Sequence, residues 1–278
     1  MPRTTLALTS FVSGEFSPKM DGRTDFEKYS SGAKTLENFL VHPQGAATRR
    51  VGTQFIAEVK SSAAKTRLIP FEFSTTQTYI LEFGNTYIRF FKDKGQILSG
   101  GSAYEISSPY LTAELFDIKF AQSADVMYIT HPNHEVMKLS RTGHTSWTLA
   151  QVDFTDGPYL ATNSTTTTLT PAQAATGSNI NITASAVTGI NGGAGFQTTD
   201  VGRIISFNSG KAKITARSST TVVACTITTA FTNTNATEAF NLGAFSDTTG
   251  HPSCVSFFEQ RLVFAGTTDE PQTLYFSK

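Results

Sequence analysis

The chain has 278 residues, enough for one large or two modest domains with a sizeable buried core. Lys plus Arg number 22 and Asp plus Glu number 22, so the net charge is zero. Charged residues make up only 16% of the sequence. This balance argues against a chain-wide electrostatic attraction to nucleic acid or anionic lipid. Apolar runs stay shorter than the roughly 18 residues that span a bilayer. The N-terminus lacks a secretory signal pattern, so we expect no membrane anchor and a cytoplasm-like compartment.

The composition favours strands over helices. The chain has 22 Phe and one Trp, together with many Thr, Ser, Gly and Asn residues, which is typical of strands joined by tight turns. The two cysteines, Cys225 and Cys254, lie far apart in the sequence and belong to no CxxC motif. This spacing argues against a disulfide scaffold or a zinc site and predicts two buried free thiols. The predicted fold class is mainly β.

The N-terminal part reads as an arm followed by a helix. Residues 13–23 contain Gly and Pro every few positions and predict an extended arm. Residues 24–40 place apolar side chains at steps of three and four, which predicts an amphipathic helix. Thr24 and Glu27 have the spacing of a capping box, and Pro43 follows as a stop signal.

Three hairpins follow, each with the same pattern of two apolar strands around a polar turn. Alternating apolar residues flank Gly84-Asn85 in the first and Pro132-Asn133 in the second, so we expect tight turns there, with positive φ at the first. An aromatic strand precedes each hairpin. The hairpins span residues 78–95, 125–141 and 261–278, and their leading strands span residues 69–73, 118–121 and 255–258.

The spacing of the hairpins indicates an interrupted repeat. Tyr79 and Val126, taken as equivalent starts, are 47 positions apart, whereas Val126 and Leu262 are 136 apart. Excising the 87 residues of 158–244 reduces the second spacing to 49. Antiparallel units recurring every 40 to 50 residues are typical of propeller blades. We therefore expect a propeller-like platform of repeated antiparallel hairpins, interrupted by an inserted domain.

The insert is rich in Thr and alternates β-branched with small residues, which predicts a small β-barrel or sandwich with a turn at Ser209-Gly210. The conformation of residues 163–177 is left open because the segment is low in complexity. The predicted organisation is an N-terminal arm and amphipathic helix (1–60), the first part of the platform (61–157), the insert (158–244) and a continuation of the platform (245–278).

The last hairpin stops within its second strand, and three units are fewer than the four or more that close a propeller ring. Two explanations stay open: the chain is part of a longer polypeptide, or other copies complete the structure. We favour the first, because an unpaired aromatic edge strand invites aggregation.

The residues predict no catalytic chemistry, cofactor or metal. His131 and His134 flank a hairpin turn, but no neighbouring Cys, Asp or Glu completes a ligand set, so we interpret them as exposed turn residues. Nucleophile-elbow, phosphate-loop, zinc-protease and dinucleotide patterns are missing from the sequence. Trp147 is interpreted as a packing anchor rather than a sugar platform. The acidic residues near strand ends show no recognisable pair of the kind that glycosidases use as acid and base or nucleophile. These residues are Glu114, Asp117, Asp125, Asp153 and Asp156.

Arg49 and Arg50 are the strongest candidates for binding a partner. Adjacent guanidinium groups bind phosphates or carboxylates with bidentate geometry, although a solvated pair is the simpler interpretation. Their position beside an irregular segment that is tethered to a rigid platform favours docking of a neighbour.

The succession of these segments resembles the N-terminal portion of tail tubular, nozzle or stabilization proteins of short-tailed bacteriophages. The resemblance runs through FVSGEFSP, GRTDFEKYSSGAKTLENFLVHPQGAATRRVGTQFIAEV, RLIPFEFSTTQTYILEFGNTYIRFF, FAQSADVMYITHP and FFEQRLVFAG. The insert is similar to a small domain that is sometimes likened to the FCCH domain of ubiquitin-activating enzymes, without any of their chemistry. Val51 departs from the family pattern, in which Pro often follows the double Arg.

The resemblance implies a non-enzymatic virion protein of the phage tail that assembles in the host cytoplasm. It implies a ring, typically a homohexamer, below the portal and adaptor, with DNA passing through the lumen unbound and with tail fibres or the tail tip as further neighbours. The partner-binding residues expected from the matching motifs are Glu15, Phe16, Pro18, Arg23, Asp25, Arg49 and Arg50. Two alternatives stay open. One is a tail component that binds or degrades host carbohydrate, and the other is a monomeric cytosolic propeller hydrolase.

Overall fold

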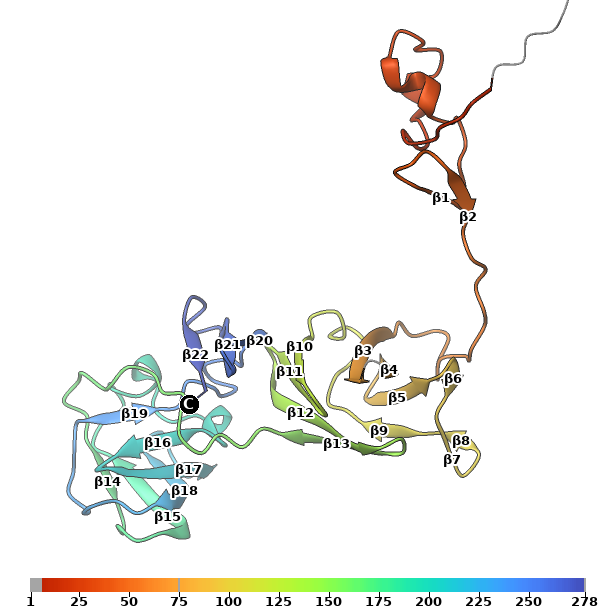
Figure 1. Cartoon of the computed structure of the whole chain (residues 1–278). Coiled ribbons are helices and arrows are strands. Elements are labelled where there is room, and N and C mark those ends of the chain that lie inside the picture. The colour runs from red at the N-terminus through yellow and green to blue at the C-terminus, as the bar shows by residue number, and fades with distance from the viewer. Residues whose placement is uncertain (1–6, 75, 278) are drawn as a thin grey trace, which may run out of the picture. The chain divides into compact units, whose positions relative to one another are not determined.

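A computed structural model describes residues 7–74 and 76–277. The chain is mainly β, as predicted, and its helical segments are short 3₁₀ turns (Figure 1). It divides into two units, Met1–Phe55 and Ile56–Lys278. Within the described residues, no helix is long and apolar enough to cross a membrane.

The first unit has little regular structure. Backbone hydrogen bonds tie residues 11–16 to residues 31–33 and 45, including a parallel bridge between Glu15 and Ala33. The segment predicted as an extended arm instead contains turns and a 3₁₀ helix. The elements of this unit are η1 (Pro18–Met20), η2 (Glu27–Ser31), β1 (Phe39–Val41) and β2 (Ala47–Arg49), and β1 pairs with β2 in an antiparallel hairpin.

The amphipathic helix predicted over residues 24–40 is wrong. Only one 3₁₀ helix, η2, forms there; it begins after Phe26 rather than after a Thr24 capping box, and Pro43 lies in the β1–β2 turn. One apolar residue of the predicted stripe makes a different contact: the ring of Tyr29 stacks on Phe16 at 5.5 Å. Gly32 lies against the same Phe16 ring, where a Cβ atom would come within 2.2 Å. Ser, Ser and Gly are also weak helix formers at the point where the helix would continue.

The second unit contains three antiparallel sheets that correspond to the three predicted hairpins, and all three leading strands are confirmed. The first sheet has the order β3-β4-β5-β6 with β9 also paired to β5; the second is β10-β11-β12-β13 and the third β20-β21-β22. The strands of these sheets, and of a separate two-stranded β7-β8 sheet, are β3 (Arg67–Ser74), β4 (Gln77–Gly84), β5 (Tyr87–Lys92), β6 (Gly95–Gln96), β7 (Leu98–Ser99), β8 (Ser102–Ala103), β9 (Glu105–Ser107), β10 (Lys119–Ser123), β11 (Val126–His131), β12 (His134–Gly143), β13 (Ser146–Gln151), β20 (Cys254–Phe258), β21 (Arg261–Ala265) and β22 (Leu274–Phe276).

The first predicted turn forms one residue later than expected. Gly84 pairs with Tyr87, so the loop residues are Asn85 and Thr86, and the positive φ falls on Thr86 at 62°. Gly84 is needed for space instead, since a Cβ there would lie 2.2 Å from the Tyr87 ring. The second turn, Pro132-Asn133, forms as predicted between paired His131 and His134.

The first two sheets share one hydrophobic core. Trp147, 5% exposed, belongs to this core: it stacks on Phe90 at 4.4 Å and meets Phe71 and Tyr79 edge to face at 4.8 and 5.2 Å. Its indole Nε1 donates to the His144 carbonyl. The interpretation of Trp147 as a packing anchor is therefore confirmed.

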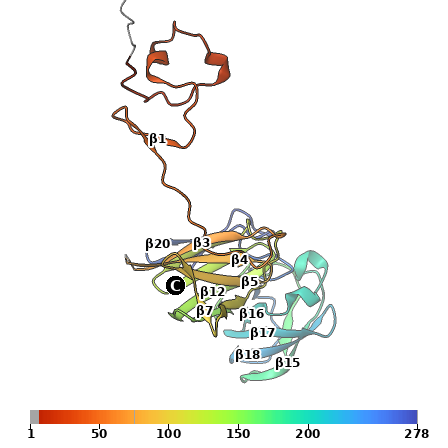
Figure 2. The same cartoon turned by 90° about the vertical axis from the view of Figure 1, so that its right-hand side faces the viewer.

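The Thr-rich stretch forms a six-stranded antiparallel sheet with a separate core. Its order is β14-β15-β18-β17-β16-β19, and the open segment 163–177 supplies β14. Figure 2 shows β15 to β18 apart from β3, β4 and β5. Cys225 is buried in this core as predicted, whereas Cys254 is exposed, contrary to prediction, at the start of edge strand β20. The elements are β14 (Leu169–Pro171), β15 (Gly177–Ala184), η3 (Asn191–Gly193), η4 (Thr198–Asp200), β16 (Ile204–Phe207), β17 (Gly210–Arg217), β18 (Val222–Thr229) and β19 (Phe240–Leu242).

The second unit thus combines repeated hairpins with a curled, half-barrel type of sheet. The chain enters and leaves the six-stranded part side by side: Ala244 N–H donates to the Pro158 carbonyl, and Tyr159 bridges to Gly243. A propeller arrangement of the hairpins, a closed barrel and the boundaries at 158 and 244 stay predictions.

Candidate functional site

The seven residues predicted to bind a partner all lie in the first unit, and most of them are engaged within it. The Glu15 carboxylate accepts the Leu36 N–H at 2.7 Å. Phe16 is half-buried against Tyr29, and Pro18 is the first residue of η1 after the capping Ser17. Glu15 and Phe16 therefore contact other residues of the first unit, and Pro18 begins one of its 3₁₀ helices.

The remaining charged members of the set differ in whether their side chains are already engaged in hydrogen bonds or ion pairs. Arg23 and Asp25 form a bidentate ion pair at 2.8 and 2.7 Å, which lowers the pKa of Asp25 although both side chains are largely exposed. Arg50 donates to Asn38 Oδ1 at 2.6 Å, because β1 and β2 bring the two residues together. Arg49, exposed at the end of β2, has no side-chain partner among the described residues. It is the charge in this set that is most available to a neighbour.

The first unit also exposes its apolar side chains. None of its hydrophobic residues from position 7 onward is buried. Val51 and Phe55 are 85% and 76% exposed, and Leu40 is 59% exposed. Sequence reasoning missed this feature because it assigned Leu40 to the apolar stripe of a helix and assigned Val51 and Phe55 to no apolar surface.

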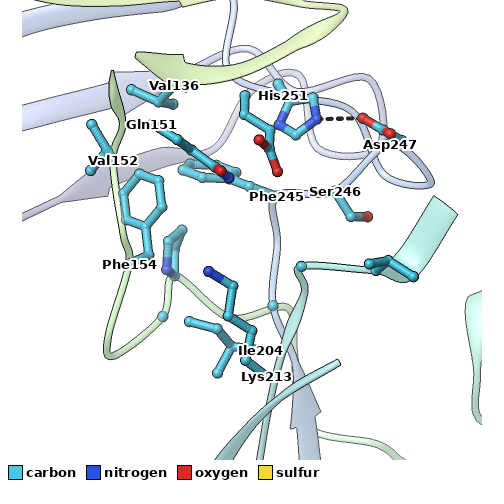
Figure 3. Close-up of a pocket in the computed structure, with 16 residues that line it drawn as sticks. Val136, Gln151, Val152, Phe154, Ile204, Lys213, Phe245, Ser246, Asp247 and His251 are labelled. Carbon is cyan, nitrogen blue, oxygen red and sulfur yellow. Dashed lines mark hydrogen bonds and ion pairs between the residues drawn. The ribbon is translucent and has the colours of Figure 1, made fainter. Parts of the chain in front are cut away.

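A pocket opens where the β12–β13 hairpin meets the two connections to the six-stranded sheet (Figure 3). Phe154 and Phe245, one from each connection, pack edge to face at 5.5 Å beside it. The imidazole of His251 pairs with Asp247 at 2.8 Å, and Lys213 pairs with Asp153 at 3.0 Å.

The pocket lacks a nucleophile paired to a base among the residues described. Ser246 lies nearby, but its hydroxyl accepts the N–H groups of Thr248 and Thr249 and bonds the Thr249 hydroxyl at 2.9 Å. His251 is oriented by Asp247 rather than toward that hydroxyl, as the dashed line in Figure 3 shows. The arrangement is that of a polar junction, and it does not reproduce a hydrolytic triad.

A second polar cluster lies at the tip of the β11–β12 hairpin. Glu114, His131 and His134 each offer a ligand atom, and the three atoms lie within 4.8 Å of one another. Burial opposes ionisation of Glu114, but the Leu111 N–H and His134 outweigh it, so the pKa of Glu114 lies below its ordinary value. Burial, reinforced by His134, lowers the pKa of His131.

This cluster corrects part of the sequence interpretation. His131 is buried rather than exposed, and the acidic residue that appeared to be missing is Glu114, 17 positions before His131. The His pair itself was recognisable, because a two-residue hairpin places its flanking residues side by side. The contribution of Glu114 depends on tertiary packing and left no local signal.

Comparison with known proteins gives no match, either to a protein-family model or to a curated protein sequence.

Proposed function

We propose that the chain is a structural protein of a bacteriophage tail that assembles as a ring, a homohexamer, below the portal and adaptor. Its hairpin modules would form a propeller-like platform, with the six-stranded part as an inserted barrel or sandwich domain. DNA would pass through the lumen without specific binding. In this proposal the protein is not an enzyme, and its mechanism is the burial of complementary surfaces around a symmetry axis.

One observation carries this proposal: the first unit is held together by hydrogen bonds, yet buries none of its described hydrophobic side chains. A segment of this size cannot gain much stability from so little burial. Exposed apolar side chains in a defined conformation are typical of a surface that a neighbouring protein covers. A subunit whose N-terminal unit docks on the next subunit or on the adaptor would have this property.

The charge distribution agrees with a passive conduit. The chain is neutral overall, and the Arg23 and Asp25 charges compensate one another. A channel that gripped DNA would neutralise phosphates with Lys and Arg and bind more tightly at low salt. Arg49, which has no such compensation in the described chain, is instead suited to a carboxylate of a neighbouring subunit.

The first experiment measures assembly of the full chain. Light scattering coupled to gel filtration gives the mass in solution, and negative-stain images give the number of subunits around the axis. The double variant Leu40→Ser/Val51→Ser should shift rings toward monomers, because it removes exposed apolar contacts without disturbing a core. The control is Leu98→Ser in the second unit, where the leucine is 55% exposed against 59% for Leu40, and this variant should assemble normally.

A second experiment tests the charge. Arg49→Ala should reduce incorporation into tails, whereas Lys65→Ala, an exposed lysine of the second unit, should not. A wild-type chain that stays monomeric at all concentrations, or that binds or shortens host polysaccharide, would favour one of the alternative functions and overturn the proposal.

A further inference from the structure

The hairpin tip that holds His131 and His134 has the geometry of a small ligand set. His131 ends β11 and His134 begins β12, and the two residues are paired across the antiparallel ladder. Directly paired residues place their side chains on one face of a sheet. Their rings accordingly lie 5.0 Å apart, centroid to centroid.

Glu114 completes the set from the turn that precedes β10. Its Oε2 accepts the Leu111 N–H at 2.8 Å and lies 2.8 Å from His134 Nε2. The carboxylate is therefore positioned by backbone before any ligand arrives, as outer contacts position ligands in metal sites. Glu114 and His134 are 18% and 23% exposed, which leaves a path for an ion from solvent.

His131 supplies an independent observation. It is 1% exposed, and its Nδ1 accepts the Asn133 N–H at 3.1 Å, so the ring proton of the neutral form lies on Nε2. That Nε2 is buried and has no hydrogen-bond partner among the described residues. The hydroxyl of Tyr110, whose ring meets His134 edge to face at 5.3 Å, is also buried and unpartnered within the same part of the chain. Buried polar atoms without partners are costly, and a bound ion or water is a usual reason for them.

We propose that Glu114, His131 and His134 bind a divalent transition metal ion, with Zn²⁺ as the best fit. Two imidazole nitrogens and one carboxylate oxygen are ligands that suit Zn²⁺ rather than Mg²⁺ or Ca²⁺. Three protein ligands leave a fourth position for water. The site is independent of the ring proposed above, and its role would be to fix the hairpin tip to the turn that holds Glu114.

Binding requires defined changes at the site. Zn²⁺ lies about 2.0 to 2.2 Å from nitrogen and oxygen ligands, so the direct contact between His134 and Glu114 must open to admit the ion. In the tautomer of neutral His134 that donates from Nε2 to Glu114, the proton moves to Nδ1, which frees the Nε2 lone pair for the ion. His131 must give up the Asn133 hydrogen bond whichever nitrogen binds, because its Nδ1 then carries either the metal or the ring proton. The Asn133 amide is therefore a reporter of occupancy.

The experiment titrates the full chain with Zn²⁺ after a chelator has removed bound metal. Calorimetry measures the heat of binding, and NMR follows the backbone amide signals. We expect one ion per chain and a large shift of the Asn133 amide, with Co²⁺ giving the visible absorption of a low-coordinate site and Mg²⁺ having no effect. Glu114→Gln and His134→Asn should each weaken binding by more than about tenfold, the smallest effect typical of losing even an outer contact. His42→Asn, an exposed histidine of the first unit, should bind as wild type does.

Two outcomes would overturn the proposal. One is a wild-type chain that binds no Zn²⁺ or whose Asn133 amide does not respond, a result that depends on no variant folding. The other is Zn²⁺ binding that Glu114→Gln and His134→Asn leave unchanged, which would place the ion elsewhere.

Discussion

Arg203 and Asp200 form an ion pair at 2.9 Å in which the two side chains are 1% and 0% exposed. Arg203 also donates to the Gly243 carbonyl and to Asn191, while Asp200 accepts the Gln197 N–H. The pair thereby connects the loop before β16 to the chain as it leaves the six-stranded sheet. Because both charged groups are removed from water, the stability of the fold depends on keeping the pair intact.

Asp200→Asn should destabilise the six-stranded part by about 3 to 5 kcal/mol, because it removes the carboxylate that is ion-paired with the buried Arg203 charge. The control is Asp153→Asn, which breaks the exposed pair with Lys213 and should cost no more than about 1 kcal/mol. Urea unfolding followed by circular dichroism measures both. Equal effects of the two variants would show that burial does not govern the Arg203 pair.

Two glycines in equivalent hairpin positions should respond differently to alanine. Gly210 follows Asn208 and Ser209, and Gly95 follows Asp93 and Lys94; in each hairpin the two loop residues have positive φ. A Cβ on Gly210 would lie 2.8 Å from backbone atoms of Phe231, whereas a Cβ on Gly95 would meet only a carbonyl at 3.7 Å.

Gly210→Ala should therefore destabilise the fold by about 1 to 3 kcal/mol, as overpacking does. Gly95→Ala should change the free energy of unfolding by less than about 0.5 kcal/mol. Thermal unfolding of the two variants, measured side by side, checks the contrast. A large effect at Gly95 would mean that the turn type, and not the approach of Phe231, makes these glycines necessary.

The strands were largely predictable because their pattern is local. Alternating apolar residues and short polar turns identified the three hairpins, and the low-charge stretch after 157 identified a separate sheet. The prediction of a helix over residues 24–40 was wrong because periodicity does not reveal what an apolar residue contacts. Tyr29 packs on Phe16, 13 positions earlier, rather than on a core. Glu114 joins the two histidines for a similar long-range reason, and sequence spacing could not place it there.

Acid should weaken the attachment of the segment before β3. Glu105 on β9 accepts from Lys60 at 2.6 Å and from Arg89 at 3.0 Å, and these contacts, led by Lys60, lower the pKa of Glu105. A carboxyl group with a lowered pKa in the folded state stabilises the fold above its unfolded pKa of roughly 4.3, and loses this contribution as the pH falls through the folded value.

Glu105→Gln should accordingly reduce stability at pH 7 and leave it nearly unchanged at pH 2 to 3. Glu58→Gln, at an exposed position with no side-chain hydrogen bond or ion pair in the described chain, is the control and should change stability little at either pH. Denaturant midpoints across this pH range make the comparison. A Glu105→Gln effect that is the same at both ends of the range would assign the loss to packing instead of charge.

Trp147 makes it possible to ask whether the six-stranded sheet unfolds by itself. It is the single tryptophan of the chain and lies in the core shared by the first two sheets, so its fluorescence reports that core, whereas circular dichroism reports every strand. The six-stranded sheet has its own core, with Cys225 and Phe240 among its members. If residues 158–244 form an independent domain, Asp200→Asn should lower the dichroism midpoint and leave the fluorescence midpoint in place, because separate cooperative units unfold in separate transitions. Coincident shifts in both signals would instead show that the insert and the hairpin modules unfold as one unit, coupled through contacts such as Phe154 with Phe245.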